Sequence, residues 1–179
     1  VSSIACELPW IQELDINPLI VDENGATAVD ARIRVDYPKP SADKYSHLAI
    51  YPYPSQYVKH AQLSNGMNVI IRPVRPEDVD LEAEFVQELT QDTILHLQLT
   101  PEMLIKMTQI DYHYEMMLVA VEGSNEDFTL GLARYVTNPD KKSCEFLLVV
   151  SDRWQGQGLG HRLMRELMEV ARQRGLEKM

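Results

Sequence analysis

The spacing of apolar residues changes along the chain, and after residue 62 most stretches follow either the strand or the helix period. Strand-like patterns predict four strands, at 68–74, 116–121, 129–137 and 143–150. Helical spacing predicts helices that begin near Arg75 and Thr100, and a third helix over 158–174. This order of elements predicts an α/β layer arrangement with one core.

The last predicted helix has an amphipathic pattern. Its apolar residues share one face: Leu159, Leu163, Leu167, Val170 and Ala171. Gly175 follows, and a glycine suits the C-terminus of a helix because it adopts left-handed backbone angles without strain.

The first 62 residues have a different character. Residues 14–21 and 28–35 are rich in apolar residues and flank a polar turn, which predicts a β-hairpin that is only marginally stable alone. Prolines and tyrosines recur over 36–62 and predict an extended linker. We therefore expect three parts, namely a hairpin at 1–35, a linker at 36–62 and an α/β domain at 63–179.

Composition limits the function classes. The chain is 45% hydrophobic and 25% charged, which is typical of a globular protein, and no apolar run is long enough to span a bilayer. A net charge of -10 argues against non-specific nucleic-acid binding. The two cysteines and five histidines share no metal-ligand spacing, so we expect no metal site from them. A cytoplasmic protein is expected.

A glycine-rich segment lies between the last strand and the last helix. It is formed by Trp154, Gln155, Gly156, Gln157, Gly158, Leu159 and Gly160. Glycines allow successive backbone N–H groups to face one point, and the helix N-terminus adds a positive dipole end, so the segment can bind a diphosphate. The alternative is a strand-to-helix turn without a ligand. A dinucleotide site is disfavoured, because no acidic residue ends a second strand about 20 positions later.

Glu145 is the candidate base. It shares a face of strand 143–150 with Leu147 and Val149, and both faces of that strand are apolar, which predicts a central strand covered on both sides. Burial raises the pKa of a carboxyl group and suits it to accept a proton. The alternative is a salt-bridged or strand-end glutamate.

The glycine segment resembles the acyl-CoA loop of the GNAT superfamily of N-acyltransferases, whose pattern Gln155, Gly158 and Gly160 match in order. The resemblance implies a GNAT fold and transfer of an acetyl group from acetyl-CoA to an amine. It also implies that the loop amides bind the pyrophosphate and that the preceding strand binds the pantetheine arm through Leu148 and Val150. Many family members place a general-base glutamate near the position of Glu145. Compared with that family, the domain is expected to be truncated after its last helix.

Residues 13–19 and 29–32 resemble the end of the ATP-grasp domain of NDP-forming acyl-CoA synthetases. In that family, residues equivalent to Asn17 and Asp30 bind Mg²⁺ with the nucleotide. The alternative is a hairpin that has lost this role.

A synthetase-like segment, a linker and a GNAT domain, in this order, resemble the junction of bacterial protein lysine acetyltransferases. The implied partner is a protein with a target lysine, with AMP-forming acyl-CoA synthetases as candidates. An exposed sheet edge that pairs with a second copy is also expected. Two other functions stay open: a non-catalytic acyl-CoA-sensing module, and a piece of an NDP-forming acyl-CoA synthetase.

Overall fold

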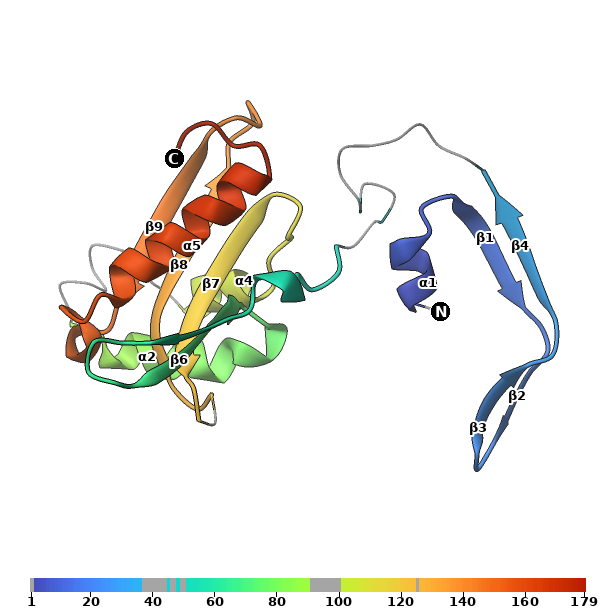
Figure 1. Cartoon of the computed structure of the whole chain (residues 1–179), viewed down its shortest axis with the longest axis horizontal. Helices are drawn as coiled ribbons and strands as arrows, with labels where there is room; N and C mark the ends of the chain where they lie inside the picture. The colour runs from blue at the N-terminus through green and yellow to red at the C-terminus, as the bar shows by residue number, and fades with distance from the viewer. Residues whose placement is uncertain (1, 37–44, 46–47, 49–50, 91–100, 125) are drawn as a thin grey trace. The chain divides into compact units, whose positions relative to one another are not determined.

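The computed structural model of the chain describes residues 2–36, 45, 48, 51–90, 101–124 and 126–179 (Figure 1). The chain divides into two compact units, Val1–Pro52 and Tyr53–Met179. Much of the linker expected at 36–62 lies outside the described residues. Its final part, from Tyr53, belongs to the second unit, ten residues before the boundary that composition suggests.

The second unit is built on an antiparallel sheet of five strands in the order β5-β6-β7-β8-β9 (Figure 1). The strands are β5 Lys59–Gln62, β6 Asn68–Pro73, β7 Glu115–Glu122, β8 Thr129–Thr137 and β9 Cys144–Val150. The four predicted strands are confirmed. Strand β5 was missed because its sequence, Lys-His-Ala-Gln, has no apolar alternation, and its pairing with β6 defines it.

Three helices in the described part of this unit cover the two faces of the sheet. They are α2 Val79–Glu88, which follows the short 3-10 turn η2 Pro76–Asp78, α4 Pro101–Thr108 and α5 Leu159–Gln173. Helix α5 packs across β7, β8 and β9, whereas α2 packs against β8 and α4. Figure 1 shows α5 on one face of the sheet, and α2 and α4 on the other. This layering matches the predicted α/β arrangement.

The alternation of side chains along β9 separates the two core layers. Leu148 and Val150 face α5, because their side-chain carbons lie 3.7 and 3.5 Å from the place where Gly160 would have a Cβ. Val149 points the other way and joins a buried cluster with Phe85 of α2 and Met107 of α4. The five apolar residues predicted for the core face of α5 are all buried.

The first unit contains a short helix and a long hairpin. Helix α1 spans Ser2–Glu7, and the strands are β1 Ile11–Ile16, β2 Leu19–Asp22, β3 Gly25–Ala28 and β4 Ala31–Val35. β1 pairs with β4 and β2 pairs with β3, so the predicted hairpin consists of two successive ladders. Most of its apolar side chains are exposed, including Leu19, Ile20, Val21, Val29, Ile33 and Val35.

Candidate functional site

The loop between β9 and α5 changes direction at two glycines. After β9 the backbone forms the short 3-10 turn η3 Asp152–Trp154, and α5 begins at Leu159. Gly156 and Gly158 have φ angles of +72° and +83°. Residues with a Cβ are strained in this left-handed region, so the loop path requires glycine at both positions.

Several backbone N–H groups of this loop can bind a ligand. Among the described residues, those of Gly156, Gln157 and Gly158 donate to no backbone carbonyl. The N–H groups of Leu159 and Gly160 lie in the first turn of α5, where no preceding helical turn offers an acceptor. Successive donors at the positive end of a helix dipole favour an anionic group such as a diphosphate.

Gly160 differs from the two turn glycines. A Cβ at Gly160 would lie in ordinary van der Waals contact with Val150 and Leu148, so the packing of α5 on β9 does not exclude a small side chain. At Gly158, no protein atom lies within 4 Å of such a Cβ, and the constraint comes from φ. Clashes with neighbouring residues therefore explain neither Gly158 nor Gly160. At Gly160, only the close approach of a ligand would require a glycine.

Side chains of the loop fix its backbone. Gln155 Nε2 donates to the Val150 carbonyl at 3.1 Å and to Asp152 Oδ1 at 2.9 Å. Gln157 Nε2 donates to the Arg153 carbonyl at 3.4 Å. The Gln155 side chain thus connects the loop to the end of β9, a structural role that the sequence pattern did not indicate.

Strand β9 is an edge strand, and the backbone groups of alternate residues face away from β8. The N–H of Cys144 donates to the Lys178 carbonyl on the outer side at 3.0 Å. The N–H of Ser151 donates inward to Leu130 at 3.0 Å. Because these directions alternate along the strand, the backbone groups of Leu148 and Val150 point outward, as those of Cys144 do. An extended ligand arm could pair with these outward groups as an added strand would.

Glu145 lies on β9, but its environment differs from the prediction. Its side chain is exposed, because β9 is the edge of the sheet rather than a central strand. The argument from burial is therefore wrong. Glu145 pairs in register with Val136 of β8, and Val136 pairs on its other side with Glu115 of β7. Its side chain shares the face of Val149, the face on which α2 and α4 pack.

Comparison with known proteins decides the family. The model of the Acetyltransferase (GNAT) family matches residues 83–179, more than half of the chain. This chain belongs to the GNAT acetyltransferase family. Its second unit therefore has the fold and the acyltransferase function of that family. An ATP-grasp domain model matches residues 1–35, the hairpin of the first unit.

The chain is also similar to individual proteins of known name or structure. An acetyltransferase of Pseudomonas aeruginosa is 34% identical over 125 residues, which are 65% of this chain and 67% of the relative. The solved GNAT domain of S. lividans PAT has a TM-score of 0.63 at 20% identity, covering 70% of this chain and 77% of that one. A cAMP-binding acyltransferase from Mycobacterium smegmatis is 24% identical, with a TM-score of 0.46 over 68% of this chain and 37% of that one.

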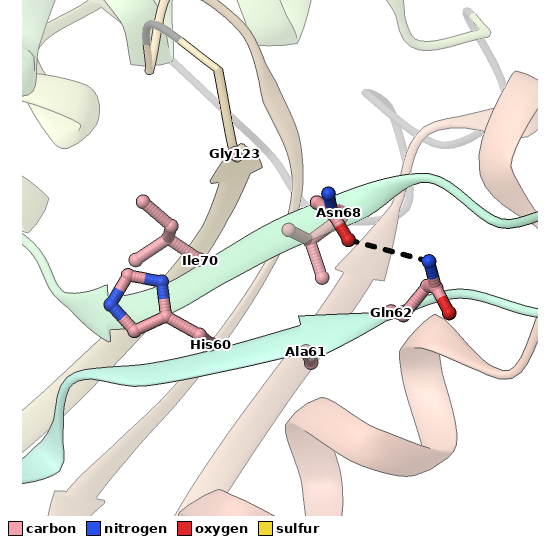
Figure 2. Close-up of a pocket in the computed structure, with 7 residues that line it drawn as sticks. His60, Ala61, Gln62, Asn68, Ile70 and Gly123 are labelled. Carbon is pink, nitrogen blue, oxygen red and sulfur yellow. Dashed lines mark hydrogen bonds between the residues drawn. The ribbon is translucent and has the colours of Figure 1, made fainter.

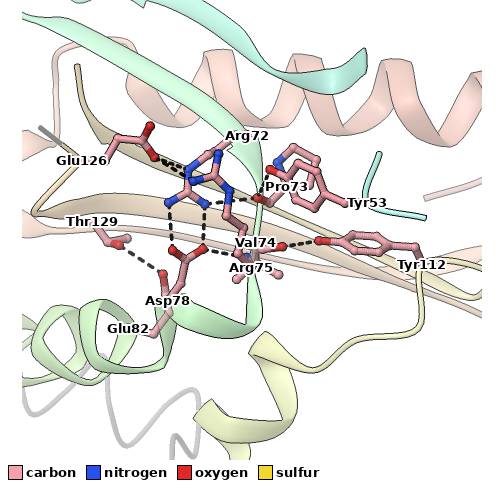
Figure 3. Close-up of polar contacts among 10 residues, drawn as sticks. All are labelled: Tyr53, Arg72, Pro73, Val74, Arg75, Asp78, Glu82, Tyr112, Glu126 and Thr129. Atoms are coloured by element: carbon pink, nitrogen blue, oxygen red, sulfur yellow. Dashed lines mark hydrogen bonds and ion pairs between the residues drawn. The ribbon is translucent and has the colours of Figure 1, made fainter. Parts of the chain in front are cut away.

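The GNAT domain also contains a buried ion-pair network that the sequence did not reveal (Figure 3). Arg72 on β6 makes a two-pronged contact with Asp78, with distances of 2.7 and 2.8 Å, and its Nε donates to Glu126 at 2.6 Å. Asp78 also accepts the Arg75 N–H at 2.7 Å. This network fixes the start of α2 against β6.

Glu82 of α2 is the most buried carboxyl group near this network. Thr129 donates to its Oε1 at 3.1 Å, while Oε2 has no hydrogen-bond partner among the described residues (Figure 3). Burial raises the pKa of Glu82 to about 7. Helical spacing in the sequence could have indicated that Glu82 is buried, because it lies three and seven positions before Phe85 and Leu89 on the core face of the helix.

A pocket that is lined by none of the glycine-loop residues lies on β5 and β6. Figure 2 shows this shallow pocket on β5 and β6, lined by His60, Ala61, Gln62, Asn68, Val69, Ile70 and Gly123. Among its lining side chains, Gln62 Nε2 donates a hydrogen bond to Asn68 Oδ1 at 3.5 Å. It contains none of the predicted site residues.

The proposed magnesium ligands of the ATP-grasp-like hairpin lie together but are open to solvent. The Asn17 N–H donates to the Asp30 carbonyl at 3.2 Å, and both residues are exposed. In the described part of the chain, no three His, Cys, Asp or Glu side chains gather as metal ligands would. Within the same part, no helix has the length and apolar character needed to cross a membrane.

Proposed function

We propose that the GNAT domain transfers an acetyl group from acetyl-CoA to the side-chain amine of a lysine in another protein. The glycine loop carries the proposal. Its N–H groups from Gly156 to Gly160 bind the diphosphate of the cosubstrate, whereas the N–H of Gln155 donates to the Asp152 carbonyl; the outward backbone groups of Leu148 and Val150 bind the pantetheine arm. A protein acceptor is proposed because a synthetase-like segment joined to a GNAT domain resembles protein lysine acetyltransferases. The ATP-grasp match at residues 1–35 supports the presence of that segment.

In this mechanism Glu145 is the general base. A lysine has an ordinary pKa of about 10.4, so it arrives as ammonium and must lose a proton before it attacks. Glu145 takes that proton directly or through a water molecule. The neutral amine attacks the acetyl carbonyl, and an outward N–H of β9 stabilises the oxyanion. CoA then leaves as the thiolate and takes up the proton that the attacking nitrogen loses as the amide forms. The exposed edge position of Glu145 leaves it accessible to an acceptor.

Direct attack is proposed rather than a covalent acyl-enzyme. Cys144, the cysteine of β9, is buried, and its Sγ contacts the Lys178 carbonyl at 3.6 Å. Burial also raises the pKa of its thiol, which lowers the fraction of reactive thiolate.

Acetyl-CoA binding is tested by isothermal titration calorimetry. Wild type should bind acetyl-CoA, and a Gly158→Asp, Gly160→Val double variant should lose binding, because it adds a negative charge and bulk at the loop. Gly175→Ala, a change at the positive-φ glycine that follows α5, is the control for altered glycine geometry. Unchanged affinity in a folded double variant would exclude the loop as the diphosphate site.

A non-catalytic acyl-CoA-binding module is the second candidate, and the exposure of Glu145 favours it. The two candidates differ in Glu145→Gln. If Glu145 is the base, acetylation of a lysine-bearing protein, such as an AMP-forming acyl-CoA synthetase, slows about 10²–10⁴-fold while acetyl-CoA binding is retained. A wild-type protein that binds acetyl-CoA but acetylates no lysine supports the sensing module instead.

A further inference from the structure

The turn between β5 and β6 touches the glycine loop, although the two are far apart in the sequence. Ser64 Oγ donates a hydrogen bond to the Gln157 carbonyl at 3.3 Å. The turn belongs neither to the family pattern of the loop nor to the segment that the GNAT family model matches, which begins at residue 83. This contact therefore needs its own explanation.

The turn is well braced. Leu63 is buried and its N–H donates to the Met67 carbonyl at 2.8 Å, while the Gly66 N–H donates back to Leu63 at 3.0 Å. Asn65 Oδ1 accepts the Met67 N–H at 2.9 Å. Gln62 Nε2 donates to the Gly66 carbonyl at 3.0 Å. Ser64 thus projects from a fixed support rather than from a loose loop.

The geometry of the peptide bond gives this contact a consequence for ligand binding. The carbonyl of Gln157 and the N–H of Gly158 belong to one planar trans peptide, so they point in opposite directions. When Ser64 binds the carbonyl, the Gly158 N–H is directed to the side away from the β5–β6 turn. That N–H donates to no backbone carbonyl among the described residues and remains available to an anion.

Without Ser64, this peptide could rotate more freely, because its rotation changes the φ angle of Gly158, and glycine tolerates a wide range of φ. Gly158 has no Cβ, and apart from its two chain neighbours no residue has an atom within 4 Å of the place where a Cβ would lie. Glycine has the largest backbone freedom, and fixing a peptide in one orientation before a ligand arrives lowers the entropic cost of binding. We propose that Ser64 is a positioning residue that orients the Gln157–Gly158 peptide so that the Gly158 N–H binds the cosubstrate diphosphate.

This proposal rests on the proposed acetyl-CoA site, and calorimetric titration of the full chain with acetyl-CoA tests it. Ser64→Ala should weaken binding about two- to tenfold, the range expected for loss of one such hydrogen bond. Ser64→Thr keeps the hydroxyl and should retain wild-type affinity. In an acetylation assay, Ser64→Ala should raise KM for acetyl-CoA and leave kcat unchanged. Ser55→Ala, at an exposed serine before β5, is the matched control.

A second readout separates orientation from general destabilisation. In ¹H–¹⁵N spectra, the Gly158 amide should shift on addition of acetyl-CoA to wild type and shift less at saturation in Ser64→Ala. Ser64→Cys, which is nearly isosteric but a weak donor, should behave like Ser64→Ala if the alanine variant folds poorly. Equal affinity and equal Gly158 shifts in wild type and Ser64→Cys would overturn the role of Ser64 while leaving the acetyl-CoA site intact. Absence of binding by wild type would overturn the proposed site itself and the role of Ser64 with it.

Discussion

The two units of the chain use similar apolar strands with opposite burial. In the GNAT domain, Ile71, Met117 and Val119 are fully buried within the five-stranded sheet. In the ATP-grasp-like hairpin, Ile20 and Val21 are 56% and 70% exposed. The difference lies in the layers, because α2, α4 and α5 cover both faces of the sheet, whereas each hairpin ladder has two strands.

This contrast shows that strand-forming residues do not by themselves make a stable unit. A two-stranded ladder cannot bury both faces and is marginal in water, whereas a covered sheet gains free energy from each apolar side chain removed from solvent. The same substitution should therefore have different costs in the two units. The two tryptophans, Trp10 and Trp154, lie one in each unit, so Trp→Phe backgrounds can report the unfolding of each separately.

The largest expected effect comes from the buried ion pair of the GNAT domain. The side chains of Arg72 and Asp78 are 2% and 6% exposed. Arg72→Met leaves the carboxylates of Asp78 and Glu126 without their main cation and should lower the free energy of unfolding by about 3–5 kcal/mol. Urea denaturation in a Trp10→Phe background measures this loss. A loss below about 1 kcal/mol would mean that the pair is solvated rather than buried.

The second effect compares apolar truncations in the two units. Leu163 of α5 is 0% exposed, so Leu163→Ala should cost about 2–5 kcal/mol through lost burial and the cavity left behind. Val21→Ala in the hairpin should change stability by less than about 0.5 kcal/mol, because its side chain is already in water. Equal losses, each measured in its own tryptophan background, would show that the hairpin face is covered in solution.

Local pattern predicted the elements of the GNAT domain better than their positions in the sheet. The strands from residue 68 onward and the core face of α5 were correct, because burial on known faces imposes the strand and helix periods. Strand β9 was wrongly placed at the centre, since its two apolar faces reflect α5 on one side and the cluster around Val149 on the other. Strand order arises from long-range pairing, which no local window contains.

In the candidate site, the sequence specified the loop but not its supports. Gln155, Gly158 and Gly160 follow a spacing that a strand-to-helix turn imposes on neighbouring residues, so the loop could be located. Ser64 contacts the loop from 93 positions away in sequence, and nothing around it in the sequence indicates this contact. In the hairpin, Asn17-Pro18 divided the expected strand into β1 and β2, a break that proline could have indicated.

The third effect concerns pH, and it involves a buried carboxyl group that only the layered unit has among the described residues. The folded pKa of Glu82, about 7, lies above its ordinary value of 4.5. Burial is the main cause. The negative charge of Asp78 also raises this pKa, whereas the hydrogen bond from Thr129 and the positive charge of Arg72 lower it. The folded state therefore retains a proton that the unfolded state loses. This contribution to stability is fully present below pH 4.5, declines between 4.5 and 7, and is lost above 7.

Glu82→Gln measures this effect, since it removes the titration and keeps the shape. The stability of the variant relative to wild type should rise by on the order of 3 kcal/mol between pH 4.5 and 8, from urea denaturation at each pH. Thr129→Val removes the donor to Oε1 and should move the upper end of the window to higher pH. A difference that is constant with pH would show that folding does not change the pKa of Glu82.

The smallest expected effect is in the hairpin, where an ion pair has the same chemistry as the Arg72–Asp78 pair but not its environment. Arg34 Nη1 lies 4.0 Å from Glu13 Oε2, and the two side chains are 77% and 70% exposed. Water screens such a pair, and ordering two long side chains costs entropy that offsets most of the attraction. A double-mutant cycle with Glu13→Ala and Arg34→Ala, followed through Trp10 in a Trp154→Phe background, should give a coupling of about 0.2–1 kcal/mol. The coupling should also fall when salt is raised from low to about 1 M, because the screening length then becomes shorter than the distance between the charges. A coupling that exceeds 2 kcal/mol and resists salt would mean that the hairpin pair is desolvated, and the contrast between the two units would then not extend to charged residues.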